Sequence, residues 1–223
     1  MISHGLWPDS VGRYDPDMIH DITPPICESM RIWPGDTPPH REIISHILEG
    51  DGSTSSTLRS TVHLGAHADA PCHYAPEGQA IDERSLDYYL GKCQVVKVSA
   101  NPSQAITPDL ILAKIETERV LIATGTCPDP RLFNEAFAAL STDLVDWLAE
   151  CNVKTVGIDT PSVDLFTSED LSVHKRCFEH DMALLENLAL DGVPEGLYEL
   201  IALPLRLVGF DASPVRAILR TLD

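Results

Sequence analysis

The chain has 223 residues, of which 43% are hydrophobic, and its 34 acidic residues outnumber 16 basic ones to give a formal net charge of −18. This length suits one domain with a sizeable core or two small domains. So acidic a surface repels phosphate backbones, which argues against nucleic acid as a partner, and no apolar run approaches the roughly 20 residues of a membrane span.

The N-terminus and the cysteines bear on the compartment. The first residues read M-I-S-H-G-L-W-P-D and lack the basic start and apolar stretch of a signal peptide. We therefore expect a cytoplasmic protein. The six cysteines form no C-x-x-C pair, which argues against a zinc ribbon or a thioredoxin-type site, so we expect them to be buried thiols.

The chain is expected to begin with an arm and a first strand. Residues 1–15 hold prolines and glycines around one tryptophan, which indicates an N-terminal arm rather than a regular element. Residues 18–23 have the pattern of a strand. An I-W-P-G-D turn at 32–36 then presents Trp33, which is either a plug at the edge of the core or a contact for a ligand.

A predicted hairpin follows this turn. Residues 41–48 and 56–64 alternate between apolar and polar side chains and are separated by E-G-D-G-S. The second strand runs into residues 61–74, which read T-V-H-L-G-A-H-A-D-A-P-C-H-Y. This stretch contains four polar side chains of metal-binding types: His63, His67, Asp69 and His73.

Imidazole nitrogen and carboxylate oxygen are the ligands that suit Zn²⁺, Mn²⁺ or Fe²⁺. The four side chains alternate with apolar residues, which also fits a half-buried strand whose histidines share one face. In an extended strand, however, His63 and His67 would stand roughly 13 Å apart, whereas the ligand atoms of one ion lie only about 2 Å from it. We therefore predict a strand that ends near His63, a turn at Gly65 and a ligand loop stiffened by Pro71.

The middle of the chain repeats a strand and helix rhythm that is typical of α/β domains. The residue patterns predict strands at 93–99, 119–124 and 154–159, and helices at 82–90, 107–115 and 141–151. Ser141 is the expected N-cap of the last helix. The segment 127–140 is a candidate loop over a pocket, and G-I-D-T-P-S-V-D at 157–164 is interpreted as a structural corner.

A further helix is predicted at 168–179, with Ser168 at its start, and it carries His174. The next apolar run reads A-L-L-E-N-L-A-L and is interrupted by Glu186. Burial of an unpaired carboxylate is costly. Glu186 is therefore exposed, paired or bound to a metal ion.

The C-terminal part is expected to add strands at 198–203 and 204–208, followed by D-A-S-P-V-R-A at 211–217, to which the pattern assigns no role. No repeat, low-complexity tract or linker interrupts residues 16–223. We predict a single α/β domain with a mixed β core and short flanking helices.

The stretch H-L-G-A-H-A-D-A-P-C-H at 63–73 matches the H-x-G-(T/A)-H-x-D-x-P-x-H signature of the cyclase-like metal hydrolases. Within that family the chain most resembles the bacterial kynurenine formamidases. The resemblance implies a swivelling β/α/β fold and a homo-oligomer, commonly a dimer. It also implies two divalent ions, zinc or alternatively manganese, that are bridged by the two carboxylates of a five-residue ligand set: His63 and His67 on one ion, His174 on the other, with Asp69 and Glu186 between them.

Such a pair of ions polarises a carbonyl and lowers the pKa of bound water to roughly 7. His73 is left to move a proton from the attacking water to the leaving nitrogen. The resemblance implies that Trp33 faces an aromatic substrate, and that the reaction converts N-formyl-L-kynurenine and water to L-kynurenine and formate in tryptophan degradation.

Other classes of protein fit the sequence less well. His67 and Asp69 also fit the H-x-D start of an iron oxygenase site with two histidines and one carboxylate, but residues 184 and 190 are leucine where such enzymes commonly carry an arginine. The chain has no G-x-S-x-G elbow and no dinucleotide or phosphate-loop motif. A non-catalytic metal protein would leave His73 without a role. The nearest alternative is a hydrolase of isatin or another small cyclic or open amide.

Overall fold

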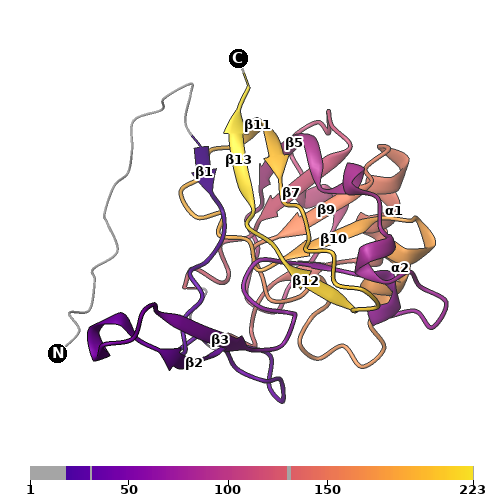
Figure 1. Ribbon diagram of the computed structural model, residues 1–223. Helices are drawn as coiled ribbons and strands as arrows, with labels where there is room; N and C mark the ends of the chain where they lie inside the picture. The colour runs from indigo at the N-terminus through magenta and orange to yellow at the C-terminus, as the bar shows by residue number, and fades with distance from the viewer. Residues whose placement is uncertain (1–18, 31, 130–131, 223) are drawn as a thin grey trace.

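A mixed β-sheet forms the centre of the molecule (Figure 1). The structure is a computed structural model that describes residues 19–30, 32–129 and 132–222, so the predicted N-terminal arm lies outside the described residues. The sheet is formed by β1 (Ile19–Asp21), β4 (His67–Asp69), β5 (Leu90–Lys97), β7 (Arg119–Ala123), β9 (Thr155–Ile158), β10 (Ala183–Glu186), β11 (Gly196–Ile201), β12 (Ala212–Pro214) and β13 (Ile218–Thr221).

The strand order is β1-β13-β11-β5-β7-β9-β10-β4-β12. The central strands β5, β7, β9 and β10 are parallel to one another, and the strands on both sides of them pair antiparallel. The parallel strands are largely buried, as expected for strands covered on both faces. The α/β class, the single domain and the mixed core are therefore confirmed.

The sheet is strongly curled. β12 and β13 are separated by only three residues, yet seven strand-to-strand steps lie between them in the sheet. Seven steps of a flat sheet would cover roughly 34 Å, whereas the link from Pro214 to Ile218 reaches at most about 14 Å. The two ends of the sheet must therefore approach each other. The link is held from both sides, because the Val215 amide donates to Ala66 and the Ile22 amide donates to Ala217.

Two apolar clusters fill the two faces of the sheet, and adjacent residues of one strand go to opposite clusters, as the strand period requires. Val96 and Leu184 face one cluster, and Val95 and Leu185 face the other. The first cluster is covered by α1 (Thr142–Glu150) and α2 (Ser172–Glu179), which also contact each other. Ser141 caps α1 as predicted, by accepting a hydrogen bond from the Leu144 amide.

Several predicted elements are wrong. The helices expected at 82–90 and 107–115 are only short 3₁₀ turns, at Ile81–Glu83, Leu86–Tyr88 and Pro108–Leu110. After the last of these turns the backbone becomes extended at Ile111, whose side chain is buried, so tertiary packing overrides the local helix signal. Residues 204–208 form no strand, and the strands β12 and β13 lie further along the chain.

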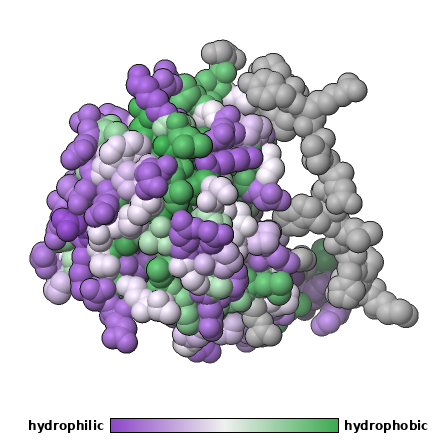
Figure 2. Space-filling model, turned by 180° about the vertical axis from the view of Figure 1, so that it is seen from behind, coloured by the Kyte–Doolittle hydropathy of each residue, from purple (hydrophilic) through white to green (hydrophobic). Residues whose placement is uncertain are grey.

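The predicted hairpin is confirmed and consists of β2 (His40–Ser45) and β3 (Ser55–Arg59), with a 3₁₀ turn at Ile47–Glu49. Its second strand ends at Arg59 rather than near His63, so the prediction of its extent is wrong. The hairpin projects from the body of the molecule (Figure 1). A second small sheet pairs β6 (Ala105–Ile106) with β8 (Ala139–Leu140). Many hydrophilic residues lie on the face seen from behind (Figure 2), and hydrophobic residues gather in a band through its centre. Among the described residues, no helix has the length and apolar character to cross a membrane.

Candidate metal centre

The centre is built on β4, which lies between β10 and β12. His67 and Asp69 are two residues apart in this strand and therefore point to the same face, and His67 lies directly opposite Glu186 of β10. The predicted ligand loop after Gly65 is thus wrong, because these residues form a buried strand. The turn at Gly65 is confirmed, with a left-handed φ of +58° that glycine adopts without strain.

Two further elements bring the other side chains to this face. The turn at Gly65 folds His63 back, so that its Nδ1 lies 3.0 Å from Oδ1 of Asp69. His174 comes from α2, 105 residues further along, and its Nε2 lies 3.3 Å from Oδ2 of Asp69. The structure therefore brings all five candidate ligands together. His67, Asp69, His174 and Glu186 are each at most 3% exposed.

Each of the three histidines has one ring nitrogen held by an oxygen acceptor outside the cluster. Nδ1 of His67 lies 2.9 Å from the carbonyl of Gly65, and Nδ1 of His174 lies 2.7 Å from Oδ2 of Asp164. Nε2 of His63 lies 3.1 Å from Oδ2 of Asp211. In a neutral imidazole the nitrogen beside an acceptor carries the proton, so the other nitrogen presents a lone pair.

These lone pairs point at carboxylate oxygens, which are acceptors too. Nε2 of His67 lies 3.4 Å from both Asp69 and Glu186, and Nε2 of His174 lies 3.4 Å from Glu186. Nε2 of His67 and Oδ1 of Asp69 are buried without a hydrogen-bond partner. Acceptors that face one another in a buried site need a cation between them. The residues present therefore fit a divalent metal ion.

The pKa shifts express the same electrostatics. Burial lowers the pKa of His67, but the carboxylates of Asp69 and Glu186 outweigh burial and raise this pKa to about 10. Burial also opposes the rise in the pKa of His174, which comes from Asp164, Asp69 and Glu186. The negative potential that favours a proton on each ring favours a metal cation in the same place.

Each carboxylate is shared by His67 and His174. Asp69 directs Oδ1 to His67 and Oδ2 to His174, and Glu186 directs Oε2 to His67 and Oε1 to His174. Two groups of three side chains have ligand atoms that all lie within 4.8 Å of one another inside the group. One group is His67, Asp69 and Glu186, the other is His63, Asp69 and His73, and Asp69 belongs to both. Carboxylates in this position are suited to bridge two ions.

His73 stands at the edge of the centre, on the 3₁₀ turn Pro71–His73. Its side chain is 33% exposed, and its ring centroid lies 4.4 Å from that of His63 and 6.0 Å from that of His174. Burial lowers the pKa of His73, which keeps the ring neutral and able to accept a proton. It is therefore available either as a ligand or as a base.

A cavity of about 380 Å³ opens above the centre, with His63, His67, His73, His174 and Glu186 in its lining. Trp33 also lines it and is 37% exposed, so the tryptophan is a cavity wall rather than a core plug. Its ring lies 5.5 Å from that of Phe133 and 5.2 Å from that of Phe166. Phe133 belongs to the segment expected to lie over a pocket, and it lines the cavity.

Two carboxylates at the site were not identified from the sequence. Asp164 lies in the segment that was interpreted as a structural corner, yet it contacts His174. Oδ1 of Asp164 accepts a hydrogen bond from the Val173 amide, and Oδ2 accepts one from the His174 amide. Helix α2 consequently begins at Ser172 rather than at 168. Asp211 opens the C-terminal motif that had no assigned role.

Comparisons with known proteins agree with this geometry. Residues 20–165 match the family described as putative cyclase. A solved potential metal-dependent hydrolase with cyclase activity is 30% identical, with a TM-score of 0.79 over 92% of this chain and 98% of that one. A predicted metal-dependent hydrolase from Bacillus stearothermophilus is 33% identical, with a TM-score of 0.77 over 91% and 97%. Isatin hydrolase A from Labrenzia aggregata shares the fold at 21% identity, with a TM-score of 0.79 over 93% and 95%.

Proposed function

This chain belongs to the putative cyclase family, and from that premise we propose that it hydrolyses the formyl amide of an N-formyl aromatic amine, with N-formyl-L-kynurenine as substrate. The broader class, a metal-dependent hydrolase of this family, follows from the matches at 30% and 33% identity. One observation supports the proposal most strongly. Histidine nitrogens with free lone pairs face the carboxylates of Asp69 and Glu186, and this cluster lies beneath a cavity that has an aromatic wall.

The proposed ligands are His63, His67, Asp69, His174 and Glu186, and the proposed ions are two zinc ions, with manganese as the alternative. When bound, the ions polarise the amide carbonyl and make a water molecule acidic enough to attack at neutral pH. Glu186 is held in place by the amide of Val163, which donates to Oε1 across 2.7 Å. The protein groups thus fix the ligand positions before substrate enters.

His73 is proposed to move the proton. It accepts a proton from water as the oxygen–carbon bond forms, and it donates that proton to the aromatic nitrogen as the carbon–nitrogen bond breaks. The products are formate and the free amine. The position of His73 at the cavity, next to His63 but one-third exposed, supports this role over that of a fourth histidine ligand.

Trp33 and Phe133 are proposed to hold the aromatic ring of the substrate. Both line the cavity, and their edge-to-face contact at 5.5 Å and 85° fixes the wall before a ligand binds. Aromatic pairs of this kind add about 0.5–1.5 kcal/mol beyond simple burial. A rigid aromatic wall favours a flat substrate over a flexible aliphatic one.

The test is release of kynurenine from N-formyl-L-kynurenine by purified protein, with the metal content measured on the same sample. We expect turnover that is lost with a chelator and restored by zinc, and about two zinc ions per chain. The Asp69→Ala variant is the control, because it removes a shared carboxylate. Absence of both metal and turnover would contradict the proposed site.

A second candidate substrate is isatin, a cyclic aromatic amide. Two isatin hydrolases share the fold of this chain at 21% identity, with TM-scores of 0.79 and 0.78. The same ring-binding wall would accept a cyclic amide, and the bond that breaks is again a carbon–nitrogen bond. Bound metal with turnover of isatin, but not of the formyl substrate, would decide for this alternative.

We also propose that the protein acts as a homodimer, with the β2–β3 hairpin in the interface. The hairpin exposes Ile43, Ile44, Ile47, Leu48 and Leu58, and a two-stranded sheet is marginally stable by itself. Burial of these side chains against a second copy would stabilise the hairpin. Sedimentation of the wild type and of the Leu58→Ser variant tests this proposal. The variant dimer should dissociate at a higher protein concentration than the wild-type dimer. A monomeric wild type would contradict the proposal.

A further inference from the structure

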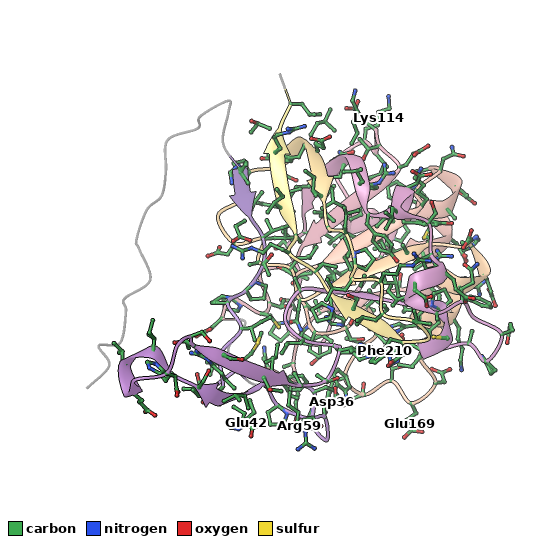
Figure 3. The ribbon with its side chains drawn as sticks, in the orientation of Figure 1. Asp36, Glu42, Arg59, Lys114, Glu169 and Phe210 are labelled. Carbon is green, nitrogen blue, oxygen red and sulfur yellow. The ribbon has the colours of Figure 1, made fainter. Side chains whose placement is uncertain are left out.

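Asp211 is held beside the ligand strand by its backbone. It immediately precedes β12, whose first residue, Ala212, lies opposite Asp69. The carbonyl of Asp211 accepts a hydrogen bond of 2.8 Å from the amide of Ala70. This pairing places the side chain of Asp211 at the cavity. Figure 3 labels the preceding residue, Phe210, in the lower part of the body.

The carboxylate of Asp211 serves two histidines through one oxygen. Oδ2 lies 3.1 Å from Nε2 of His63, within hydrogen-bond distance, and 3.8 Å from Nδ1 of His73. The two rings are themselves in contact, with centroids 4.4 Å apart. Asp211 therefore lies beside both a proposed ligand and the proposed base, hydrogen-bonded to His63 and close to His73.

The contact with His63 decides which nitrogen is free. Nδ1 of His63 lies 3.0 Å from Oδ1 of Asp69, so a carboxylate faces each ring nitrogen. If the proton sat on Nδ1, it would be donated to Asp69 and no lone pair would face the centre. Because Asp211 accepts from Nε2–H, it stabilises the tautomer with Nδ1 free.

We propose that Asp211 is a positioning residue of this centre, which keeps Nδ1 of His63 free for an ion and holds His73 against His63. Its effect on turnover rests on the proposed function, whereas its effect on metal binding does not. Outer carboxylates that orient a ligand histidine are worth about 10- to 100-fold in metal affinity or activity. The local sequence places Asp211 at the start of the D-A-S-P-V-R-A motif but assigns it no role.

Asp36 provides a matched control. It lines the same cavity and is exposed, and it carries the same charge, but among the described residues it makes none of the histidine contacts that Asp211 makes. A change of Asp36 to alanine therefore removes one negative charge from the cavity and leaves the histidines untouched. Asp211→Asn provides the conservative variant, because its amide oxygen still accepts from Nε2–H of His63.

The experiment measures zinc affinity by competition with a chromophoric chelator, and kcat and KM separately. For Asp211→Ala we expect zinc affinity and kcat to fall by about 10- to 100-fold, whereas KM should stay within about twofold of the wild-type value. For Asp36→Ala, zinc affinity, kcat and KM should all stay within about twofold of the wild-type values. Asp211→Asn should recover most of both losses. Two results would overturn the proposal. The first is wild-type zinc affinity and kcat in Asp211→Ala. The second is an equal loss in Asp211→Ala, Asp211→Asn and Asp36→Ala, which would show that only the negative charge of the cavity matters.

The two proposals fail in different ways. If the wild type binds zinc but hydrolyses neither the formyl substrate nor isatin, the proposed function is wrong, and the zinc competition of the variants still decides the role of Asp211. If the wild type is active and Asp211→Ala behaves like the wild type in both measurements, only the role of Asp211 is wrong.

Discussion

Nδ1 of His174 lies 2.7 Å from Oδ2 of Asp164, and both side chains are buried. The same carboxylate accepts hydrogen bonds from the amides of Val173 and His174, at the start of α2. One side chain therefore caps a helix and orients a proposed metal ligand on that helix. The position of His174 depends on Asp164 through both contacts.

Substitution of Asp164 by alanine should weaken zinc binding by about 10- to 100-fold, because His174 loses its orienting acceptor. It should also cost about 1 kcal/mol of unfolding free energy, because the helix loses its cap. Chelator competition and urea unfolding measure the two effects. Asp170→Ala, at an exposed residue of the same segment, should change neither, and equal zinc affinity in the two variants would contradict the role of Asp164.

The His73→Ala variant should keep its metal and lose about 10²- to 10⁴-fold in kcat, since a positioned proton-transfer group contributes that much. Asp69→Ala should lose both metal and turnover, because Asp69 contacts three histidines. Metal analysis beside steady-state kinetics separates the two cases. Full activity of His73→Ala would remove the proton-transfer role, and loss of metal from it would make His73 a ligand.

Phe133→Leu should lower kcat/KM for the aromatic formyl substrate by roughly 2- to 12-fold, which corresponds to one aromatic pair. The loss follows from the contact of Phe133 with Trp33 in the cavity wall. An aliphatic N-formyl amine should show little change in the same variant. Phe178→Leu, at a partly buried residue outside the cavity lining, is the control. If both substrates lose equally, Phe133 has no role in selecting the ring.

Asp181 should make stability depend on pH. Burial raises its pKa, but hydrogen bonds from Tyr88 and Arg84, each 2.7 Å long, outweigh burial and lower the pKa. Folding therefore favours the ionised form. The stabilisation is present above the unfolded pKa of about 3.9 and is lost as the pH falls through the lower folded pKa.

We expect Asp181→Asn to cost at most about 1 kcal/mol at neutral pH, because the Asp181 side chain is largely exposed and solvent screens the pair. The difference from the wild type should shrink towards zero in strong acid. Urea unfolding between neutral pH and pH 3 measures it. Asp87→Asn, on the neighbouring turn, serves as the control, and a difference that grows in acid would contradict the assigned sign.

The sequence alone determined the residue types and much of the secondary structure. Alternation in residues 41–64 predicted the hairpin, apolar runs predicted β5, β7 and β9, and Ser141 marked the start of α1, because these signals are local. The turn at Gly65 was predicted because an extended strand would hold His63 and His67 too far apart to bind one ion. Local patterns failed where burial of single side chains such as Ile111 determined the backbone.

Only the tertiary structure decided how the site is assembled. It made β4 a strand between β10 and β12, placed Glu186 opposite His67, and brought Asp211 to His63 across 148 residues of sequence. The sequence places Asp164 and Asp211 in two short motifs but assigns neither carboxylate to the site. Their function arises from strand register and from the short link that closes the curled sheet, and these depend on pairing between distant segments rather than on any local pattern.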